Sequence, residues 1–316
     1  MHIISRTAGN AVWFDNREKE HIKNLLLRFA AGFYVHIHSY CIMSNHFHIL
    51  LSDRTNDAEH ATPEELLTRY QKIYGKNSFP PEGFVNKDGS MTPDEDGGVQ
   101  RLRNRLGSIS RFVQEFKQSC TRWYNKQYDR KGYMWGDRFK SVAVDKGEAR
   151  LVCSAYIDLN PVRAGITTQP DDYRWSSLGW RARQPNAAAR QLQTIFGADC
   201  DLPELNTVAK LRSESDQLAW YREFVYLSGG VERVGKGGIH SHHVRQVTRY
   251  HGHLGIGNTL RYRLRNISEG VAIGSPVFIE NIQRKSQRKI IRPRPFLKGG
   301  LLYATRVLHP KPASPP

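Results

Sequence analysis

Two histidines in a short apolar run suggest a metal site. His46 and His48 are separated by one residue in the run SNHFHILL. Because side chains alternate across a β-strand, both imidazoles would project from one face if this run is extended. Two neighbouring imidazoles suit a divalent metal ion. His36 and His38 share the same spacing, so spacing alone does not choose between the two pairs.

A tyrosine and an asparagine in the run SAYIDLNPVRAGI form a second element with chemical potential. Tyr156 and Asn160 are four residues apart, which makes them neighbours on one face of a helix. Pro161 is expected to end that helix, because the residue before a proline disfavours helical geometry. Taken alone, the pair reads as a core tyrosine and a helix-terminal asparagine. If the helix lies across the strand of His46 and His48, it adds a phenol nucleophile and a third metal ligand, the Asn160 carbonyl oxygen.

The elements that must position these residues alternate between strand and helix patterns. Asp15, followed by Glu18, indicates the start of a capped helix that ends near Gly32. Ser44 and Asn45 indicate the turn of a hairpin. The other expected elements are strands at 2–6, 34–43, 46–51 and 139–144 and helices at 63–74, 108–128 and 148–160. The order β-α-β-β-α-β-α predicts an α+β fold with one antiparallel sheet and helices on one face.

The chain divides into two regions, 1–180 and 181–316. Within the first region, residues 53–107 read as an insertion that holds one short helix and a long loop. The second region is expected to be mainly helical or irregular, and basic. Its expected elements are a helix at 206–227, an irregular segment at 229–266 and two short helices at 268–283.

The charge of the chain favours a polyanionic partner. Its 316 residues contain 47 Lys+Arg and 30 Asp+Glu, a formal net charge of +17. Residues 229–316 hold 16 Lys+Arg and 3 Asp+Glu, so they supply +13 of this excess. Apolar residues, at 39%, suffice for a sizeable core, and no apolar stretch approaches the about 20 residues of a membrane span. With no signal peptide and four widely spaced cysteines, we expect a cytoplasmic, nucleoid-associated protein without a disulfide scaffold or a zinc ribbon.

The motifs together resemble a known family. CIMSNHFHILL, followed by YIDLNPVRAG, is similar to IS200-like single-tyrosine transposases of the HUH endonuclease group, most of all to their REP-associated branch. GYMWGDRFKSVAV resembles the stretch before the tyrosine helix of that family. The resemblance covers about residues 1–180 without the insertion, and it selects His46 and His48 over the earlier pair. The sequence departs from the family at Ser44, where proline is common, and in the long insertion at 53–107.

The resemblance implies a fold, a reaction and residue roles. It implies a ferredoxin-like catalytic domain that cuts and rejoins single-stranded DNA beside hairpins. Tyr156 would attack DNA to give a 5′-phosphotyrosine and a free 3′-hydroxyl. The implied metal ligands are His46, His48 and Asn160. We expect Mg²⁺ or Mn²⁺, because Mg²⁺ prefers oxygen ligands and imidazole suits Mn²⁺ better.

Several basic residues and one aromatic residue are candidates for DNA contacts. They are Trp135, Arg138, Lys140 and Arg163 near the expected site, and Arg284, Lys285, Arg288, Lys289, Arg292 and Arg294 in the C-terminal region. Trp135 also reads as a core aromatic, and Asn45 reads as a turn residue. The histidines between 240 and 253 are expected to lie in a loop and not to form a second metal site.

The sequence therefore predicts a metal-dependent endonuclease and strand transferase that acts on hairpin-bearing, REP-like single-stranded DNA. Monomer and homodimer both remain open, and no membrane partner is expected. The alternative is a catalytically silent hairpin DNA- or RNA-binding protein of the same fold. A third reading is a metal-dependent hydrolase that uses water, in which Tyr156 would be dispensable.

Overall fold

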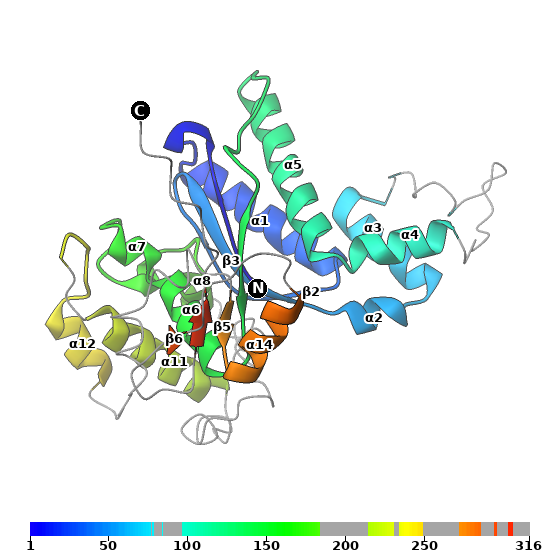
Figure 1. The fold of residues 1–316 in the computed structure, drawn as a ribbon. Helices are drawn as coiled ribbons and strands as arrows, with labels where there is room; N and C mark the ends of the chain where they lie inside the picture. Colours follow the sequence, from blue (N-terminus) through cyan, green and yellow to red (C-terminus); the bar gives the residue numbers. More distant parts are fainter. Residues whose placement is uncertain are drawn as a thin grey trace, which may run out of the picture.

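The computed structural model describes most of the N-terminal region and parts of the C-terminal region (Figure 1). The described residues are 1–76, 78, 84, 97–183, 214–230, 234–248, 272–285, 294–295 and 303–305. They form an α+β structure around a mixed sheet whose strand order is β2-β3-β1-β4-β5-β7-β6. None of the helices within these ranges is both long and apolar enough to cross a membrane.

Four antiparallel strands form the part of the sheet built by the first half of the chain. They are β1 (His2–Arg6), β2 (Val35–Ile42), β3 (His46–Asp53) and β4 (Lys140–Val144). A tight turn joins β2 to β3, and the Met43 amide donates to the His46 carbonyl at 2.8 Å. The expected strands and the expected hairpin are therefore confirmed.

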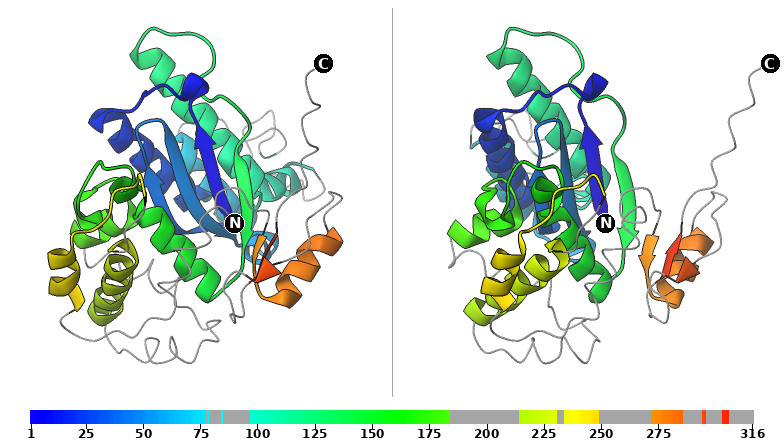
Figure 2. Two further views of the ribbon diagram at one scale, coloured as in Figure 1. Left: turned by 60° about the vertical axis from the view of Figure 1, so that its left-hand side comes forward. Right: turned by 90° about the vertical axis from the view of Figure 1, so that its left-hand side faces the viewer.

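The C-terminal region extends the sheet beyond β4. β5 (Ala272–Gly274) pairs with β4 in parallel, and β7 (Tyr303–Thr305) and β6 (Arg294–Pro295) follow in antiparallel pairing. The sheet is thus mixed, and the expectation of a purely antiparallel sheet is wrong. The expectation of two helices at 268–283 is wrong in its first half, because a buried strand there pairs with the open edge of β4. Within the described part of this range, 272–283, the helix is α14 (Pro276–Lys285), and it lies beside these strands (Figure 2).

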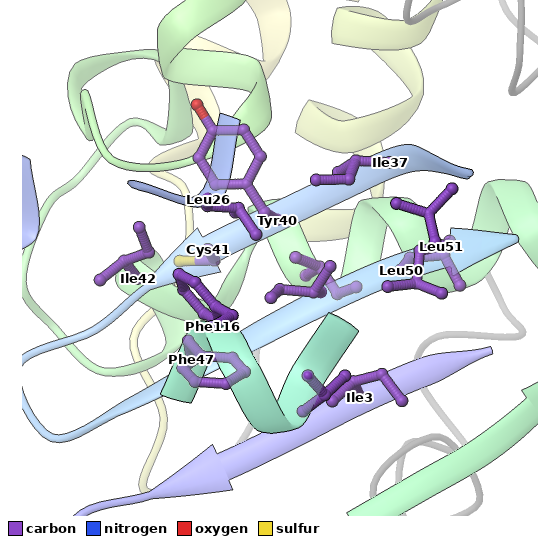
Figure 3. Close-up of a cluster of buried hydrophobic side chains, with 14 of the residues drawn as sticks. Ile3, Leu26, Ile37, Tyr40, Cys41, Ile42, Phe47, Leu50, Leu51 and Phe116 are labelled. Atoms are coloured by element: carbon purple, nitrogen blue, oxygen red, sulfur yellow. The ribbon is translucent and has the colours of Figure 1, made fainter. Parts of the chain in front are cut away.

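Two helices cover one face of the sheet. α1 (Asn16–Gly32) and α5 (Ile109–Gln127) lie against each other (Figure 1). The predicted capping box is present, since Asp15 N–H donates to the Glu18 carboxylate at 2.8 Å. Figure 3 shows Phe47 of β3 next to Phe116 of α5, and their ring centroids are 5.5 Å apart. Aromatic and aliphatic side chains of this layer form the main core.

A third helix covers the other face. α6 (Glu148–Asp158) follows β4 and packs on β2 and β3, and the short α7 (Asn160–Arg163) follows it. Phe47 contacts α5, whereas its neighbour His48 contacts Tyr156 of α6. Because adjacent strand residues point to opposite faces, α5 and α6 lie on opposite sides of the sheet. The expectation that all helices share one face is therefore wrong for α6, which follows β4 and covers the face opposite to α1 and α5.

The described parts of the segment 53–107 form three helices, where the sequence predicted one, and they pack on the core. These are α2 (Thr55–Glu59), α3 (Pro63–Tyr74) and α4 (Gly98–Leu106). α3 packs on α1 at Gly32, where an added Cβ would lie 2.1 Å from Ile73 Cγ1. Gly32 does end α1, but its φ is not positive, so close helix packing explains this glycine better than a left-handed cap. The long loop expected at 77–99 lies largely outside the described residues.

The expected boundary near residue 181 falls within α8 (Ser177–Arg183). Arg181 is fully buried and donates to the His38 carbonyl at 2.8 Å. α11 (Glu214–Gly229) then packs on α6, which agrees with the expected helix at 206–227 where that range is described. The expectation of an irregular segment at 229–266 is wrong for α12 (Ser241–Thr248), which packs on α11. The expectation of a loop is also wrong for His242 and His243 of the histidine cluster, because both lie in α12. Smaller elements are the 3-10 turns η1 (Ala8–Asn10) and η2 (Pro170–Asp172).

Candidate active site

A cavity of about 630 Å³ opens on the face of the sheet that α6 covers. It collects residues from β1, β3, β4, α6, α7 and the segment before α12. The lining consists of Ile4, Ser5, Arg6, Thr7, Gly9, Met43, His46, His48, Gly136, Asp137, Arg138, Lys140, Tyr156, Asn160, Arg163, Ala164 and Lys236. The sequence-predicted tyrosine, both selected histidines and the asparagine therefore all border the same space.

Strand register brings the two histidines to this cavity. His46 pairs with Arg6 of β1, and His48 pairs with Ile4, so both imidazoles lie on one face. Their ring centroids are 5.1 Å apart. Burial, followed by the Arg6 charge, lowers the pKa of His46 to about 4. Burial also lowers the pKa of His48 well below its usual value, so both rings are neutral at pH 7 and keep a nitrogen lone pair.

Tyr156 reaches the histidines from α6. Its ring lies edge-on to the His48 ring, with 5.8 Å between centroids. A similar edge contact, at 6.0 Å, joins it to His2 of β1. Tyr156 is only partly buried and lines the cavity, so its phenol lies at the boundary between the packed face and open space.

Asn160 lies next to the tyrosine on the same side of the cavity. Its side-chain Nδ2 donates to the carbonyls of Tyr156, at 2.9 Å, and of Ile157, at 3.3 Å. The expectation that the helix ends at Asn160 before Pro161 is wrong. α6 ends at Asp158, Leu159 keeps helical dihedrals, and Asn160 begins α7. A proline is tolerated in the first turn of a helix, which is where Pro161 lies.

The alternative histidine pair lies elsewhere. The β2–β3 register shifts between Ile37 and Ser39, which breaks the alternation of side chains at this point. His36 is exposed, whereas His38 is buried and its Nε2 lies 2.9 Å from Ser52 Oγ. Neither lines the cavity, so the structure brings together the pair that the resemblance selected.

Both cavity histidines have a polar partner at Nδ1. Asn45 Oδ1 lies 2.6 Å from His46 Nδ1. His2 Nε2 lies 3.0 Å from His48 Nδ1, and the two rings are stacked with centroids 5.2 Å apart. The sequence predicts no contact for His2, and it predicts a turn position for Asn45. His2 lies in the predicted strand at 2–6, but only the register between β1 and β3 shows that it lies beside His48.

Cationic side chains surround the rest of the cavity. Arg138 and Lys140 line it, as expected, and so do Arg6 and Lys236, which the sequence did not indicate. Asp137 is the one acidic side chain among these described lining residues. The cavity wall therefore carries a positive excess that suits phosphate groups.

Arg163 borders the cavity but uses its guanidinium to hold the chain. Nη1 donates to the Gly237 carbonyl at 3.1 Å, and Nη2 donates to the Ser228 carbonyl at 2.8 Å. These bonds fix the segment that carries Lys236. The structure thus gives Arg163 a positioning role beside its expected place near the site.

Trp135 lies behind the cavity and does not line it. Its indole packs on Phe14 and Phe47, and its Nε1 donates to the Lys117 carbonyl at 3.1 Å. The position matches the reading as a core aromatic. The stacking role expected for Trp135 has no counterpart in this packing.

The C-terminal basic cluster is only partly described. Arg284 is exposed on α14, where its Nη2 donates to Asn281 Oδ1 at 2.7 Å. Lys285 ends α14, and Arg294 lies in β6. Arg288, Lys289 and Arg292 lie outside the described residues, as do His251 and His253 of the C-terminal histidine cluster.

The donors at the cavity fit a divalent cation of intermediate hardness. Burial keeps both imidazoles neutral. The Asn160 side-chain nitrogen donates to helix carbonyls, so the side-chain oxygen is the atom that could bind a metal ion. Across the described ranges, no cluster of three or more His, Cys, Asp or Glu side chains is arranged to hold a metal ion. The set of His46, His48 and Asn160 contains two histidines and an asparagine, so it does not count as such a cluster.

Comparisons of the chain with known protein families, with curated proteins and with solved structures gave no match.

Proposed function

We propose that this chain is a metal-dependent single-stranded DNA endonuclease and strand transferase of the single-tyrosine HUH type, in the REP-associated branch. The observation that carries the proposal is the position of Tyr156. It comes from α6, the helix that follows β4 in the chain, and it lies edge-on to His48 in a cavity that His46 and Asn160 also line. A nucleophile and a set of metal-binding donors around one cationic cavity fit phosphoryl transfer.

The arrangement of the elements supports the same family. The strand order β2-β3-β1-β4, with α1 and α5 on one face, corresponds to the ferredoxin-like order β-α-β-β-α-β. α6 then follows the last strand of this unit and covers the opposite face. The proposal thus places the nucleophile on a helix added to a ferredoxin-like core.

The proposed reaction exchanges one phosphodiester for another. The Tyr156 phenol oxygen forms a bond to phosphorus, and the bond from phosphorus to the 3′-oxygen breaks. The phenol loses its proton and the departing 3′-oxygen gains one, so the products are a 5′-phosphotyrosine and a free 3′-hydroxyl. Attack by another 3′-hydroxyl reverses the step and transfers the strand, and no nucleotide energy source is consumed.

The residues around the nucleophile have separate tasks. His46, His48 and Asn160 would hold Mg²⁺ or Mn²⁺, which supplies positive charge to the scissile phosphate. Arg138, Lys140 and other cations of the lining attract the DNA backbone into the cavity. The expected substrate is single-stranded DNA next to a REP-like hairpin.

A denaturing gel separates the proposal from its alternatives. The protein is incubated with end-labelled, hairpin-bearing single-stranded DNA and Mn²⁺ or Mg²⁺, beside Tyr156→Phe, which keeps the ring packed on His48. The proposal predicts a covalent protein–DNA adduct that Tyr156→Phe lacks. Cleavage that survives Tyr156→Phe would identify a hydrolase that uses water, and binding without cleavage would identify a catalytically silent DNA- or RNA-binding protein.

A further inference from the structure

Each of the two cavity histidines has a hydrogen-bond partner at Nδ1. These partners lie in β1 and in the turn before β3, and not in α6. Asn45 Oδ1 lies 2.6 Å from Nδ1 of His46, and His2 Nε2 lies 3.0 Å from Nδ1 of His48. His2 is fully buried and is not among the residues that line the cavity. It stands behind His48, with its Nε2 directed at that ring and not at open space.

The contact with Asn45 decides which nitrogen of His46 carries the proton, whereas the contact between His2 and His48 allows either ring to be the donor. A neutral imidazole has one N–H donor and one acceptor nitrogen. An amide oxygen can only accept, so the contact with Asn45 requires a proton on Nδ1 of His46. The lone pair of His46 is then at Nε2. In the contact between His2 and His48 one proton is shared between two nitrogens, and the placement of that proton sets the lone pair of His48 in the same way.

We propose that Asn45 and His2 are positioning residues that hold His46 and His48 as Nδ1–H tautomers, with both Nε2 lone pairs available to a metal ion. This inference rests on the proposed function only for the identity of the ligand. A metal-binding histidine commonly donates its second ring N–H to an outer partner, which fixes the ring and raises its basicity. Here the outer partners are in place before any cation binds.

The fold explains why these two residues take this role. β1 and β3 pair so that His48 lies opposite Ile4 and Leu50 lies opposite His2. His2 and His48 are therefore diagonal neighbours on the same face, within reach of large side chains. Asn45 is adjacent to His46 in the turn, and its own φ is not positive, so this turn does not require asparagine for its backbone. Its side chain contacts the histidine, with Oδ1 at 2.6 Å from His46 Nδ1.

The tautomers can be measured without metal and without DNA. Two-bond proton–nitrogen correlation spectra of ¹⁵N-labelled full-length protein at pH 7 distinguish Nδ1–H from Nε2–H rings. His46→Gln and His48→Gln assign the signals. We expect Nδ1–H patterns for both rings, although the Nε2–H form is the usual one in free histidine. A Nε2–H pattern for either ring would overturn the inference, whether or not the protein cleaves DNA.

Matched variants connect the tautomers to metal binding. Titration with Mn²⁺, followed by electron paramagnetic resonance of the free ion, gives the affinity. Asn45→Ala and His2→Leu remove the acceptors, and each should weaken Mn²⁺ binding about 10- to 100-fold. Asn45→Asp and His2→Gln keep an acceptor oxygen, and they should retain an affinity close to the parent. His36→Ala, outside the cavity, controls for loss of an unrelated histidine.

The outcomes separate this inference from the proposed nuclease. Nδ1–H rings together with acceptor-dependent Mn²⁺ affinity support it even if no DNA adduct forms. A DNA adduct together with Nε2–H rings would support the proposed nuclease and contradict the positioning role of Asn45 and His2. Equal loss of affinity in the acceptor-keeping and acceptor-removing variants would also contradict it, because only a packing role would then explain both.

Discussion

The ring of Tyr156 stands perpendicular to the ring of His48, with 89° between the planes and 5.8 Å between the centroids. This relationship depends on which face of the sheet α6 covers. Phe47, one residue before His48, points into the layer of α1 and α5. A helix placed on that layer would bring its tyrosine to the core and not to the histidines.

The residue that fixes α6 in place is buried next to the tyrosine turn. Asp158 Oδ2 accepts from Tyr221 Oη of α11 at 2.6 Å, and Oδ1 accepts from the Leu178 amide at 2.9 Å. Burial raises the pKa of Asp158 to about 6. Because this pKa exceeds the ordinary 3.8, the folded chain holds a proton between about pH 4 and 6 that the unfolded chain has lost. The contribution of Asp158 to stability therefore falls as pH rises through this window and is constant above it.

Asp158→Asn should reveal the stability that the parent loses when Asp158 ionises in the folded protein. The variant cannot ionise, so its stability relative to the parent should improve as pH rises from about 4 to about 7, by on the order of 3 kcal/mol at most. Urea denaturation of both proteins across this range measures the difference, in which the other titrating groups cancel. A difference that is constant with pH would mean that Asp158 titrates normally in the folded protein.

Substitutions in the two His-x-His pairs should have opposite effects on the yield of the covalent adduct. His46→Ala and His48→Ala each remove a donor of the proposed metal site, so the covalent adduct should fall below detection with both Mg²⁺ and Mn²⁺. His36→Ala removes the exposed member of the other pair and should leave the adduct yield unchanged. Circular dichroism checks that all three variants are folded. An adduct that persists in His48→Ala would remove the metal role from this strand.

Local signals in the sequence predicted much of the fold. The capping box at Asp15 and Glu18 appears as expected, and the helices expected at 63–74 and 108–128 are present as α3 and α5. Pro63 in the first turn of α3 and the Ser108 cap of α5 are local signals of the same kind. The hairpin of β2 and β3 follows from two apolar runs and a short turn. The resemblance then selected the correct pair of histidines to line a cavity with Tyr156 and Asn160.

Features that depend on packing between distant segments were not predictable in this way. Hydrophobic periodicity places a helix against a sheet without stating which face, so the order of the elements alone placed α6 on the same face as the other helices. β5 is three residues long and forms because β4 offers an open edge. Lys236 reaches the cavity from a glycine-rich segment, and its position depends on the hydrogen bonds of Arg163 to chain carbonyls.

The segment that carries Lys236 should contribute to DNA binding in a salt-dependent manner. Lys236 is exposed, so Lys236→Ala should change the free energy of unfolding by less than about 0.5 kcal/mol. If the lysine contacts a phosphate, the slope of log K against log salt should decrease by about 0.7 for single-stranded DNA. Fluorescence anisotropy at several salt concentrations measures this slope. Lys72→Ala, an exposed lysine of α3 away from the cavity, makes the same charge change and should leave it unaltered.

Arg163→Ala should act on the same segment by a different route. It removes two hydrogen bonds to main-chain carbonyls, at 3.1 Å and 2.8 Å, each of which contributes about 1 kcal/mol in a typical case. We therefore expect both lower stability and weaker DNA binding, whereas Lys236→Ala weakens binding alone. If Arg163→Ala left the unfolding transition in place, the guanidinium would not be holding the segment.

The contact of α3 with α1 tests whether the segment 53–107 belongs to the core. An added Cβ at Gly32 would lie 2.1 Å from Ile73 Cγ1 and 2.8 Å from the Arg69 carbonyl oxygen. Gly32→Ala should therefore destabilise the protein by about 1–3 kcal/mol, despite the better helix propensity of alanine. Ile73→Ala makes room for the new methyl group, so the double variant should be more stable than the sum of the two single effects predicts. Denaturation of the four proteins in this cycle measures the coupling, and simple additivity would show that α3 does not press on α1 in solution.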